Sequence, residues 1–179
     1  YESTTPESFA SSVDAESSTA NSVTTWNDIN PQRLLKINAV QNTTSKKPIL
    51  ENNAINGLPA VKFDGASGVN GDYLEANDVA AYFTGDDKPM SAFVVFNQKN
   101  ISVTCQILSL SRSSNNNPVM YSKADPNVVN IFGKRDDSGA IPTSTTIANI
   151  QKPNIISYSY SGTNVSTYFN KNIVVNNGS

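Results

Sequence analysis

The chain has 179 residues and a formal net charge of -2, and its polarity comes from Ser, Thr and Asn, because only 16% of its residues are charged. This length fits one folded domain, and the low net charge argues against intrinsic disorder. The largest basic cluster is Lys46-Lys47 and the pI is near 5.0, which argues against a nucleic-acid partner. No apolar run approaches the roughly 20 residues of a membrane span, so we expect no membrane contact from this segment.

Short strands separated by polar turns are predicted for the first half of the chain, after an edge strand and a surface loop in residues 1–22. The predicted strands are Val23–Trp26, Leu34–Val40, Pro48–Leu50, Ala60–Phe63 and Asp72–Glu75. In the second of these strands, the alternation of Leu35, Ile37 and Ala39 with polar residues predicts that these three side chains are buried. Trp26 is expected in the core.

The centre of this half is the turn Asn56-Gly57, followed by Leu58-Pro59. Gly accepts a positive φ and Pro fixes its own φ, so this sequence favours a turn before the next strand. In that strand we expect the apolar side chains Ala60, Val61 and Phe63 to be buried and Lys62 to face outward. Asp72–Glu75 is then predicted to be an adjacent strand, with a polar loop between the two at one rim.

The second half of the chain predicts more strands and scarcely any helix. Asn77–Phe83 is the best helical candidate, with one or two turns. Met90–Phe96 is a nearly unbroken apolar run, which is typical of a strand buried on both faces or central to a sandwich. The other predicted strands are Cys105–Ser111, Val119–Lys123, Val128–Phe132, Asn154–Tyr160, Val165–Phe169 and Ile173–Val175. This pattern predicts an all-β sandwich or jelly roll in one domain, residues 1–179.

Several short motifs follow one another in a fixed order. They are Trp26-Asn27-Asp28, the element from Asn56 to Gly65 (Asn-Gly-Leu-Pro-Ala-Val-Lys-Phe-Asp-Gly), Tyr73-Leu74 and the apolar strand Met90–Phe96. The ordered set resembles the laminin-G-like, concanavalin-A-like jelly-roll family of extracellular modules, from Tyr1 to about Asn177. The resemblance implies a two-sheet antiparallel jelly-roll β-sandwich with at most one short helix. It also implies display outside the cell, on a cell surface or on a virion, as a segment of a longer chain.

Catalytic chemistry finds little support in the residue types. The chain contains no His, which excludes Ser-His-Asp and Cys-His arrangements. Glucanases of the concanavalin-A-like superfamily share the signature Glu-x-Asp-x-x-Glu, and this sequence does not contain it. We therefore expect a protein that is not an enzyme, with a glycoside-active enzyme as the third alternative.

Acidic and amide side chains gather in the loops that follow the central turn. Calcium takes six to eight oxygen ligands from such groups, and members of the resembled family hold calcium at a loop rim. The loop donors are Asp64, Asn70, Asp72, Asp78, Asp86 and Asp87. The predicted calcium ligands are Asp64, Asp72 and Asp78. The alternative is that these residues only form turns, as short acidic residues beside Gly and Asn commonly do.

Glycan recognition is the activity that the resemblance implies most directly. It requires an aromatic face that stacks on a sugar, with amide groups that bind hydroxyls. The predicted carbohydrate-binding residues are Tyr73, Tyr82, Asn116 and Tyr121, and the remaining tyrosines of the predicted strands are Tyr158, Tyr160 and Tyr168. The alternative is that tyrosines on strands pack across the sheet.

The sequence therefore predicts a non-catalytic binding or adhesion module whose partner is a glycan or surface polysaccharide, with calcium as a possible cofactor. The competing hypothesis is architectural: the outer domain of a pilin-like filament subunit, or of a phage or viral surface protein, with neighbouring subunits as partners.

Overall fold

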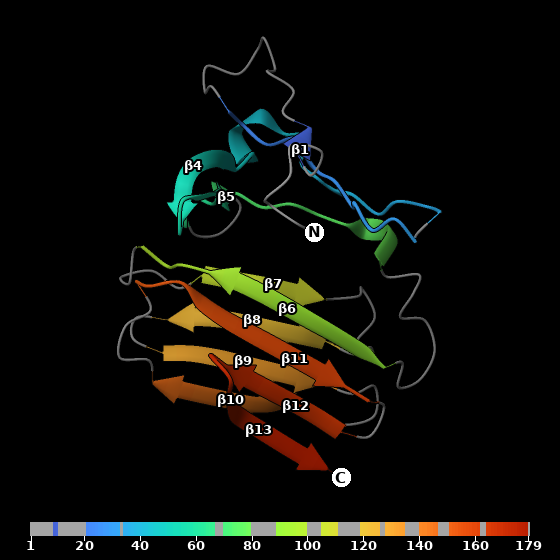
Figure 1. Cartoon of the computed structure of the whole chain (residues 1–179), viewed down its shortest axis with the longest axis vertical. Coiled ribbons are helices and arrows are strands. Elements are labelled where there is room, and N and C mark those ends of the chain that lie inside the picture. The colour runs from blue at the N-terminus through green and yellow to red at the C-terminus, as the bar shows by residue number, and fades with distance from the viewer. Residues whose placement is uncertain are drawn as a thin grey trace. The chain divides into compact units, whose positions relative to one another are not determined.

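The computed structural model describes residues 9–10, 21–32, 34–66, 70–79, 89–99, 105–110, 119–125, 128–134, 140–146, 151–161 and 164–178. These residues form antiparallel sheets with almost no helix (Figure 1), so the predicted all-β class is confirmed. Among them, no helix is long and apolar enough to cross a membrane. The chain divides into two compact units, Tyr1–Val79 and Ala80–Ser179, and each is described by itself.

The first unit contains one three-stranded sheet and one hairpin. The sheet has the order β1 (Phe9–Ala10), β2 (Thr25–Trp26), β3 (Ala39–Val40), and the hairpin pairs β4 (Ile49–Ile55) with β5 (Leu58–Lys62). A short 3-10 helix, η2 (Thr44–Lys46), precedes the hairpin. Trp26, which was expected in the core, is half-buried.

The predicted turn at Asn56-Gly57 joins β4 to β5. Both residues have positive φ, 50° and 81°, as a two-residue hairpin turn of the primed type requires. The strand after it begins at Leu58 and ends at Lys62. Phe63, which was predicted to be buried, lies beyond the end of the ladder and is 44% exposed.

The predicted strand Leu34–Val40 is wrong in its first half. Leu34 is fully exposed and Leu35 is 77% exposed, and pairing begins only at Ala39. The backbone N–H of Ile37 donates to Oδ2 of Asp28 at 3.2 Å. This N–H is therefore not available for pairing with a neighbouring strand. Ile37 itself is buried, as predicted.

The predicted strand Asp72–Glu75 is also wrong. The segment makes one isolated bridge, in which Glu75 and Val40 exchange backbone hydrogen bonds of 2.8 and 3.0 Å. The ladder does not extend to Asp72, because the N–H of Asp72 donates to a carboxylate oxygen of Asp64. The helical segment predicted after it is a single 3-10 turn at residues 77–79, and residues 80–83 lie outside the described residues.

The second unit contains two four-stranded antiparallel sheets, with the orders β10-β9-β8-β7 and β13-β12-β11-β6. The strands are β6 (Met90–Phe96), β7 (Cys105–Leu110), β8 (Val119–Asp125), β9 (Val128–Lys134), β10 (Ala140–Thr146), β11 (Asn154–Tyr160), β12 (Asn164–Phe169) and β13 (Asn172–Gly178). The predicted pairs β8/β9 and β11/β12 are confirmed. No strand was predicted at β10, where Pro142 counts against a sheet position.

The strand β6 is an edge strand of its sheet, next to β11 (Figure 1). Its side chains alternate between the two faces. Met90 and Ala92 point to the half-buried side, whereas Phe93 and Val95 are 76% and 57% exposed. The prediction of burial on both faces is therefore wrong for β6.

The most buried side chains of this unit lie on β11. Tyr158 and Tyr160 are 4% and 2% exposed, and Met90, Ala92 and Leu108 pack against them. Because Leu108 belongs to β7 and the tyrosines to β11, this apolar cluster includes side chains from both four-stranded sheets.

Candidate functional site

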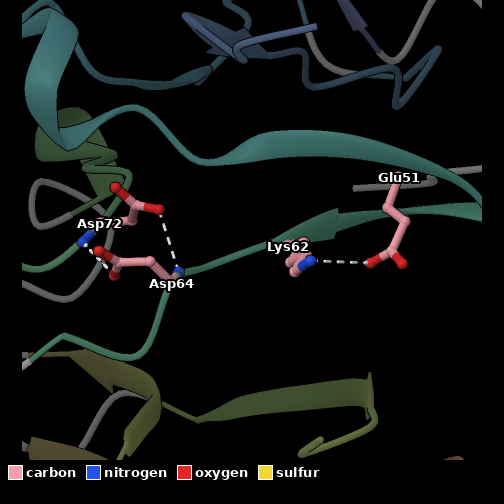
Figure 2. Close-up of polar contacts among 4 residues, drawn as sticks. All are labelled: Glu51, Lys62, Asp64 and Asp72. Atoms are coloured by element: carbon pink, nitrogen blue, oxygen red, sulfur yellow. Dashed lines mark hydrogen bonds and ion pairs between the residues drawn. The ribbon is translucent and has the colours of Figure 1, made fainter. Parts of the chain in front are cut away.

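The polar loop predicted after β5 is closed at its base by two carboxylates that bind each other's backbone. The N–H of Asp64 donates to Oδ2 of Asp72 at 3.0 Å, and the N–H of Asp72 donates to Oδ1 of Asp64 at 3.1 Å (Figure 2). The Oδ1 of Asp64 also accepts from the N–H of Ala66 at 3.0 Å. We call this arrangement the aspartate clamp, and it fixes the chain on both sides of the loop.

The aspartate clamp brings two negative charges together. Burial raises the pKa of Asp72 above its ordinary value of 3.8. The hydrogen bond from the backbone of Asp64 lowers this pKa and the negative charge of Asp64 raises it, and the net direction is upward. The folded protein therefore destabilises the ionised form of Asp72 relative to its protonated form. A cation or a hydroxyl donor near the carboxylate would stabilise the ionised form.

A second polar contact lies on the hairpin that leads to the clamp. Nζ of Lys62 on β5 is 3.8 Å from Oε2 of Glu51 on β4 (Figure 2). Both side chains are partly exposed, and surface ion pairs of this kind contribute little to stability. The pair connects the two strands of the hairpin, so we assign it no part in binding.

Immediately after the clamp lies Tyr73, which is 38% exposed. Its backbone is held on both sides, because its N–H donates to the carbonyl of Lys46 at 3.2 Å and its carbonyl accepts from Nε2 of Gln41 at 3.4 Å. Nζ of Lys46 lies 5.5 Å from the centroid of the Tyr73 ring, within the range of a cation–π contact. The ring is thus an exposed aromatic surface in a fixed position.

Sequence analysis did not identify Lys46 or Gln41 as neighbours of Tyr73. Gln41 is buried, and its Oε1 accepts the N–H of Thr43 at 2.9 Å, which orients the amide toward Tyr73. The two residues lie on the segment around η2, about 30 positions from Tyr73 in the chain. No local pattern signals such a contact.

The three predicted calcium ligands are not brought together. Asp64 and Asp72 are in contact, but Asp78 lies in the 3-10 turn of residues 77–79 and is exposed. Within the described ranges, no group of three or more His, Cys, Asp or Glu could hold a metal ion. In the clamp, one oxygen of each carboxylate already accepts loop N–H groups, so the clamp falls short of the six to eight oxygens of a calcium site. Calcium binding stays a prediction.

Of the four predicted carbohydrate-binding residues, only Tyr73 has a described side chain. Tyr82 and Asn116 lie outside the described residues, and for Tyr121 the structure describes only the backbone, on β8 opposite Phe132 of β9. The remaining tyrosines of the predicted strands separate into two buried ones, Tyr158 and Tyr160, and the partly exposed Tyr168. The buried pair therefore packs in the core, as the alternative interpretation predicts.

The sequence matches no protein-family model. No curated protein and no solved structure matches it either. The function therefore has to be argued from the residues described above.

Proposed function

We propose that the chain is a non-catalytic extracellular binding or adhesion module that recognises a glycan at the surface around Tyr73. We propose for it the two-sheet jelly-roll sandwich of the laminin-G-like family that the ordered sequence motifs resemble. Its place is on a cell surface or a virion, and its partner is a glycan or surface polysaccharide.

The observation that carries this proposal is the exposed ring of Tyr73, which directly follows the aspartate clamp in the chain and has Nζ of Lys46 over it. Aromatic rings give a large rigid contact surface at low entropic cost, with a polar group at one end. Hydrogen bonds from Gln41 and to Lys46 hold the Tyr73 backbone, so little ordering is needed when a ligand stacks on the ring. The carboxylate oxygens of Asp64 and Asp72, in the loop that precedes Tyr73, are hydrogen-bond acceptors of the kind that bind sugar hydroxyl groups.

The packing of the second unit supports the sandwich. Leu108 of one four-stranded sheet packs on Tyr158 and Tyr160 of the other, as residues of two facing sheets do. A rigid sandwich with functional groups on its connecting loops is a common arrangement for binding modules.

We propose no catalytic activity for this chain because of its residue types. The chain has no His. A retaining glycosidase needs a carboxylic acid and a carboxylate on opposite sides of the bond that is cleaved, whereas Asp64 and Asp72 bind each other's backbone N–H. A glycoside-active enzyme would release new reducing ends from a bound glycan, and we expect none.

A glycan array with the purified chain at about 1 µM, presented on a multivalent carrier, tests the proposal, since linking several copies lets an array detect a weak single site by avidity. We expect discrete glycan hits that are lost in Tyr73→Ala and kept in Tyr73→Phe, because stacking does not require the hydroxyl. Tyr168→Ala is the matched control, since Tyr168 is 36% exposed and Tyr73 is 38% exposed. A blank array, or hits that survive Tyr73→Ala, would overturn the proposal.

The same array with a chelator tests the calcium prediction separately. Loss of the hits without calcium would support calcium as a cofactor. Unchanged hits would assign the two clamped carboxylates a role in shaping the loop alone.

The second candidate function is the architectural one, as an outer domain of a filament subunit or of a phage or viral surface protein. The observation that favours it is the edge strand β6, which carries the exposed apolar side chains Phe93 and Val95. Exposed apolar groups at a sheet edge favour contact with another chain. This function predicts that the chain associates with neighbouring subunits, whereas the glycan-binding function does not require it.

A further inference from the structure

Four strands of the second unit lie at a sheet edge: β6, β13, β7 and β10. An edge strand presents unpaired backbone N–H and C=O groups, and natural proteins protect such edges with Pro, bulges or charged side chains. In β7 and β13 the pairing register skips one residue, Ile107 and Val174 respectively. The strand β10 contains Pro142, which has no N–H to donate. Three of the four edges therefore carry a feature that opposes further pairing.

The strand β6 carries none of these features. Its seven residues, Met90–Phe96, pair with β11 in an unbroken register, and they include no Pro and no charged side chain. Among the described residues, β6 pairs with β11 alone, on one of its two sides (Figure 1). Backbone groups of an antiparallel strand point alternately to its two sides, so about half of those of β6 point away from β11. Within the described part of the chain, this edge is open to a further strand.

The sequence of β6 is complementary to itself in antiparallel order. A two-fold axis at Phe93 places this residue opposite Phe93 of a second copy. In every other pair a smaller residue then faces a larger one: Ser91 and Val95, Ala92 and Val94, and Met90 and Phe96. The two residues of each pair lie an even number of positions apart, so their backbone groups point to the same side of the strand. This axis therefore brings the unpaired N–H and C=O groups of the two edges opposite one another.

The exposed side chains of β6 fit the same axis. Phe93 and Val95 are 76% and 57% exposed, and Ser91 is also exposed. In the pairing above, the two Phe93 rings are directly opposite, and each Val95 lies diagonally from Phe93 of the other copy. Directly opposed side chains are roughly 5 Å apart, and diagonal neighbours are within reach of an aromatic ring. Pairing would therefore cover apolar groups that a single copy leaves in water.

We propose that β6 pairs with β6 of a second copy of this chain, antiparallel about a two-fold axis at Phe93. The two four-stranded sheets then join into one sheet of eight strands. The contact uses the same surface on both copies, so it closes as a dimer. A second copy is the partner that the residues favour, because β6 is self-complementary and sets no charge against a like charge. The inference does not depend on glycan binding at Tyr73.

The size of the contact predicts a weak dimer. An aromatic side chain has about 150 to 250 Å² of surface, so Phe93 and Val95 of two copies together supply on the order of several hundred Å². Stable interfaces bury about 1,200 to 2,000 Å². We therefore expect a dissociation constant in the micromolar range, where the fraction of dimer depends on concentration.

Sedimentation velocity of the full chain at about 10 to 500 µM tests the association. We expect a dimer that weakens at least about tenfold in Phe93→Lys, because two like charges would face each other at the axis. Tyr168→Lys is the matched control. Tyr168 is 36% exposed on the same face, two strands away from the edge, so this variant should associate as the wild type does. Equal losses in both variants would indicate stacking of sheet faces and overturn the edge contact.

A mixture of two variants tests the axis. Phe93→Lys and Phe93→Glu should each fail to dimerise alone, whereas the mixture should form mixed pairs, because opposite charges then meet at the axis. Misfolding of either variant could not produce such a recovery, and urea unfolding confirms that both are folded. A wild-type chain that stays monomeric at all these concentrations, or a mixture without recovery, would overturn the proposal.

The outcomes for the two sites are distinguishable. Phe93→Lys leaves Tyr73, Lys46 and the aspartate clamp unchanged, so its binding to the glycan array on a multivalent carrier reports on the proposed function alone. Loss of the dimer with intact glycan binding supports the pairing of β6. A blank array with an intact wild-type dimer would overturn the glycan function and still support the pairing of β6.

Discussion

Asp64 and Asp72 each accept a hydrogen bond from the other's backbone, at 3.0 and 3.1 Å. This reciprocal contact closes the loop between them and sets the position of Tyr73, the next residue. It also explains why strand pairing at Glu75 does not extend back to Asp72, since the N–H of Asp72 is used by a side chain. Four predictions follow from the contacts of the described residues.

Asp64→Ala removes the acceptor for two backbone N–H groups, those of Asp72 and Ala66. We expect it to lower the free energy of unfolding by about 1 to 3 kcal/mol, since each such hydrogen bond contributes roughly 0.5 to 1.5 kcal/mol. Asp64→Asn keeps an oxygen at this position and should lose less. Urea denaturation of the two variants measures the difference, and equal losses would argue against the clamp.

The raised pKa of Asp72 gives a pH dependence with a definite sign. In the unfolded chain the carboxyl of Asp72 has its ordinary pKa of 3.8, and in the folded chain this pKa is higher. Between these two values the folded state binds more protons, so the contribution of Asp72 to stability falls as the pH rises. We expect the wild type to gain stability relative to Asp72→Asn when the pH is lowered through this window. Urea unfolding of both proteins at several pH values measures this difference, and a constant difference would contradict the prediction.

Tyr158 gives a second pH dependence, at the alkaline end. Burial raises its pKa from 10.0 to about 12. Between these values the unfolded chain loses the phenolic proton and the folded chain keeps it, so stability falls as the pH rises from 10 to about 12. Tyr158→Phe should make unfolding less dependent on pH in this range. Tyr168→Phe, at a partly exposed position, is the control, and the same flattening in both variants would show that burial of Tyr158 is not the cause.

Two adjacent isoleucines on β11 test the assignment of its faces. Ile156 is 3% exposed and Ile155 is 49% exposed. Ile156→Ala should cost about 2 to 5 kcal/mol, the range for a buried aliphatic side chain, whereas Ile155→Ala should cost less than about 1 kcal/mol. Thermal or urea unfolding compares them, and similar losses would mean that the two faces are assigned incorrectly.

Strand positions in the second half were predictable from local pattern. Along Asn154–Tyr160, buried side chains alternate with exposed or half-buried ones. This period of two is a property of the strand itself, because successive side chains point to opposite faces. The Asn56-Gly57 turn was predictable for the same reason, because positive φ at two successive residues favours these two residue types. Such features depend on neighbours in the sequence.

The environment of a strand was less predictable. Met90–Phe96 has the composition of a buried strand, yet Phe93 is 76% exposed because it lies on the face of the sheet opposite the buried Tyr158. Leu35 is exposed for a related reason: the carboxylate of Asp28 takes the N–H of Ile37 and delays the ladder. Whether an apolar residue is buried depends on what packs against it.

The candidate site shows the same division. Asp64, Asp72 and Tyr73 were identified from the sequence as carriers of binding chemistry, because residue type alone determines which groups can bind hydroxyls, cations or rings. Only the tertiary structure decided that the two carboxylates hold each other's backbone and that Lys46 lies over the tyrosine ring. The sequence by itself determined an all-β chain without histidine chemistry, since these properties are local or compositional. Pairing between distant segments decided which faces are buried and which side chains meet, since such contacts depend on the path of the whole chain.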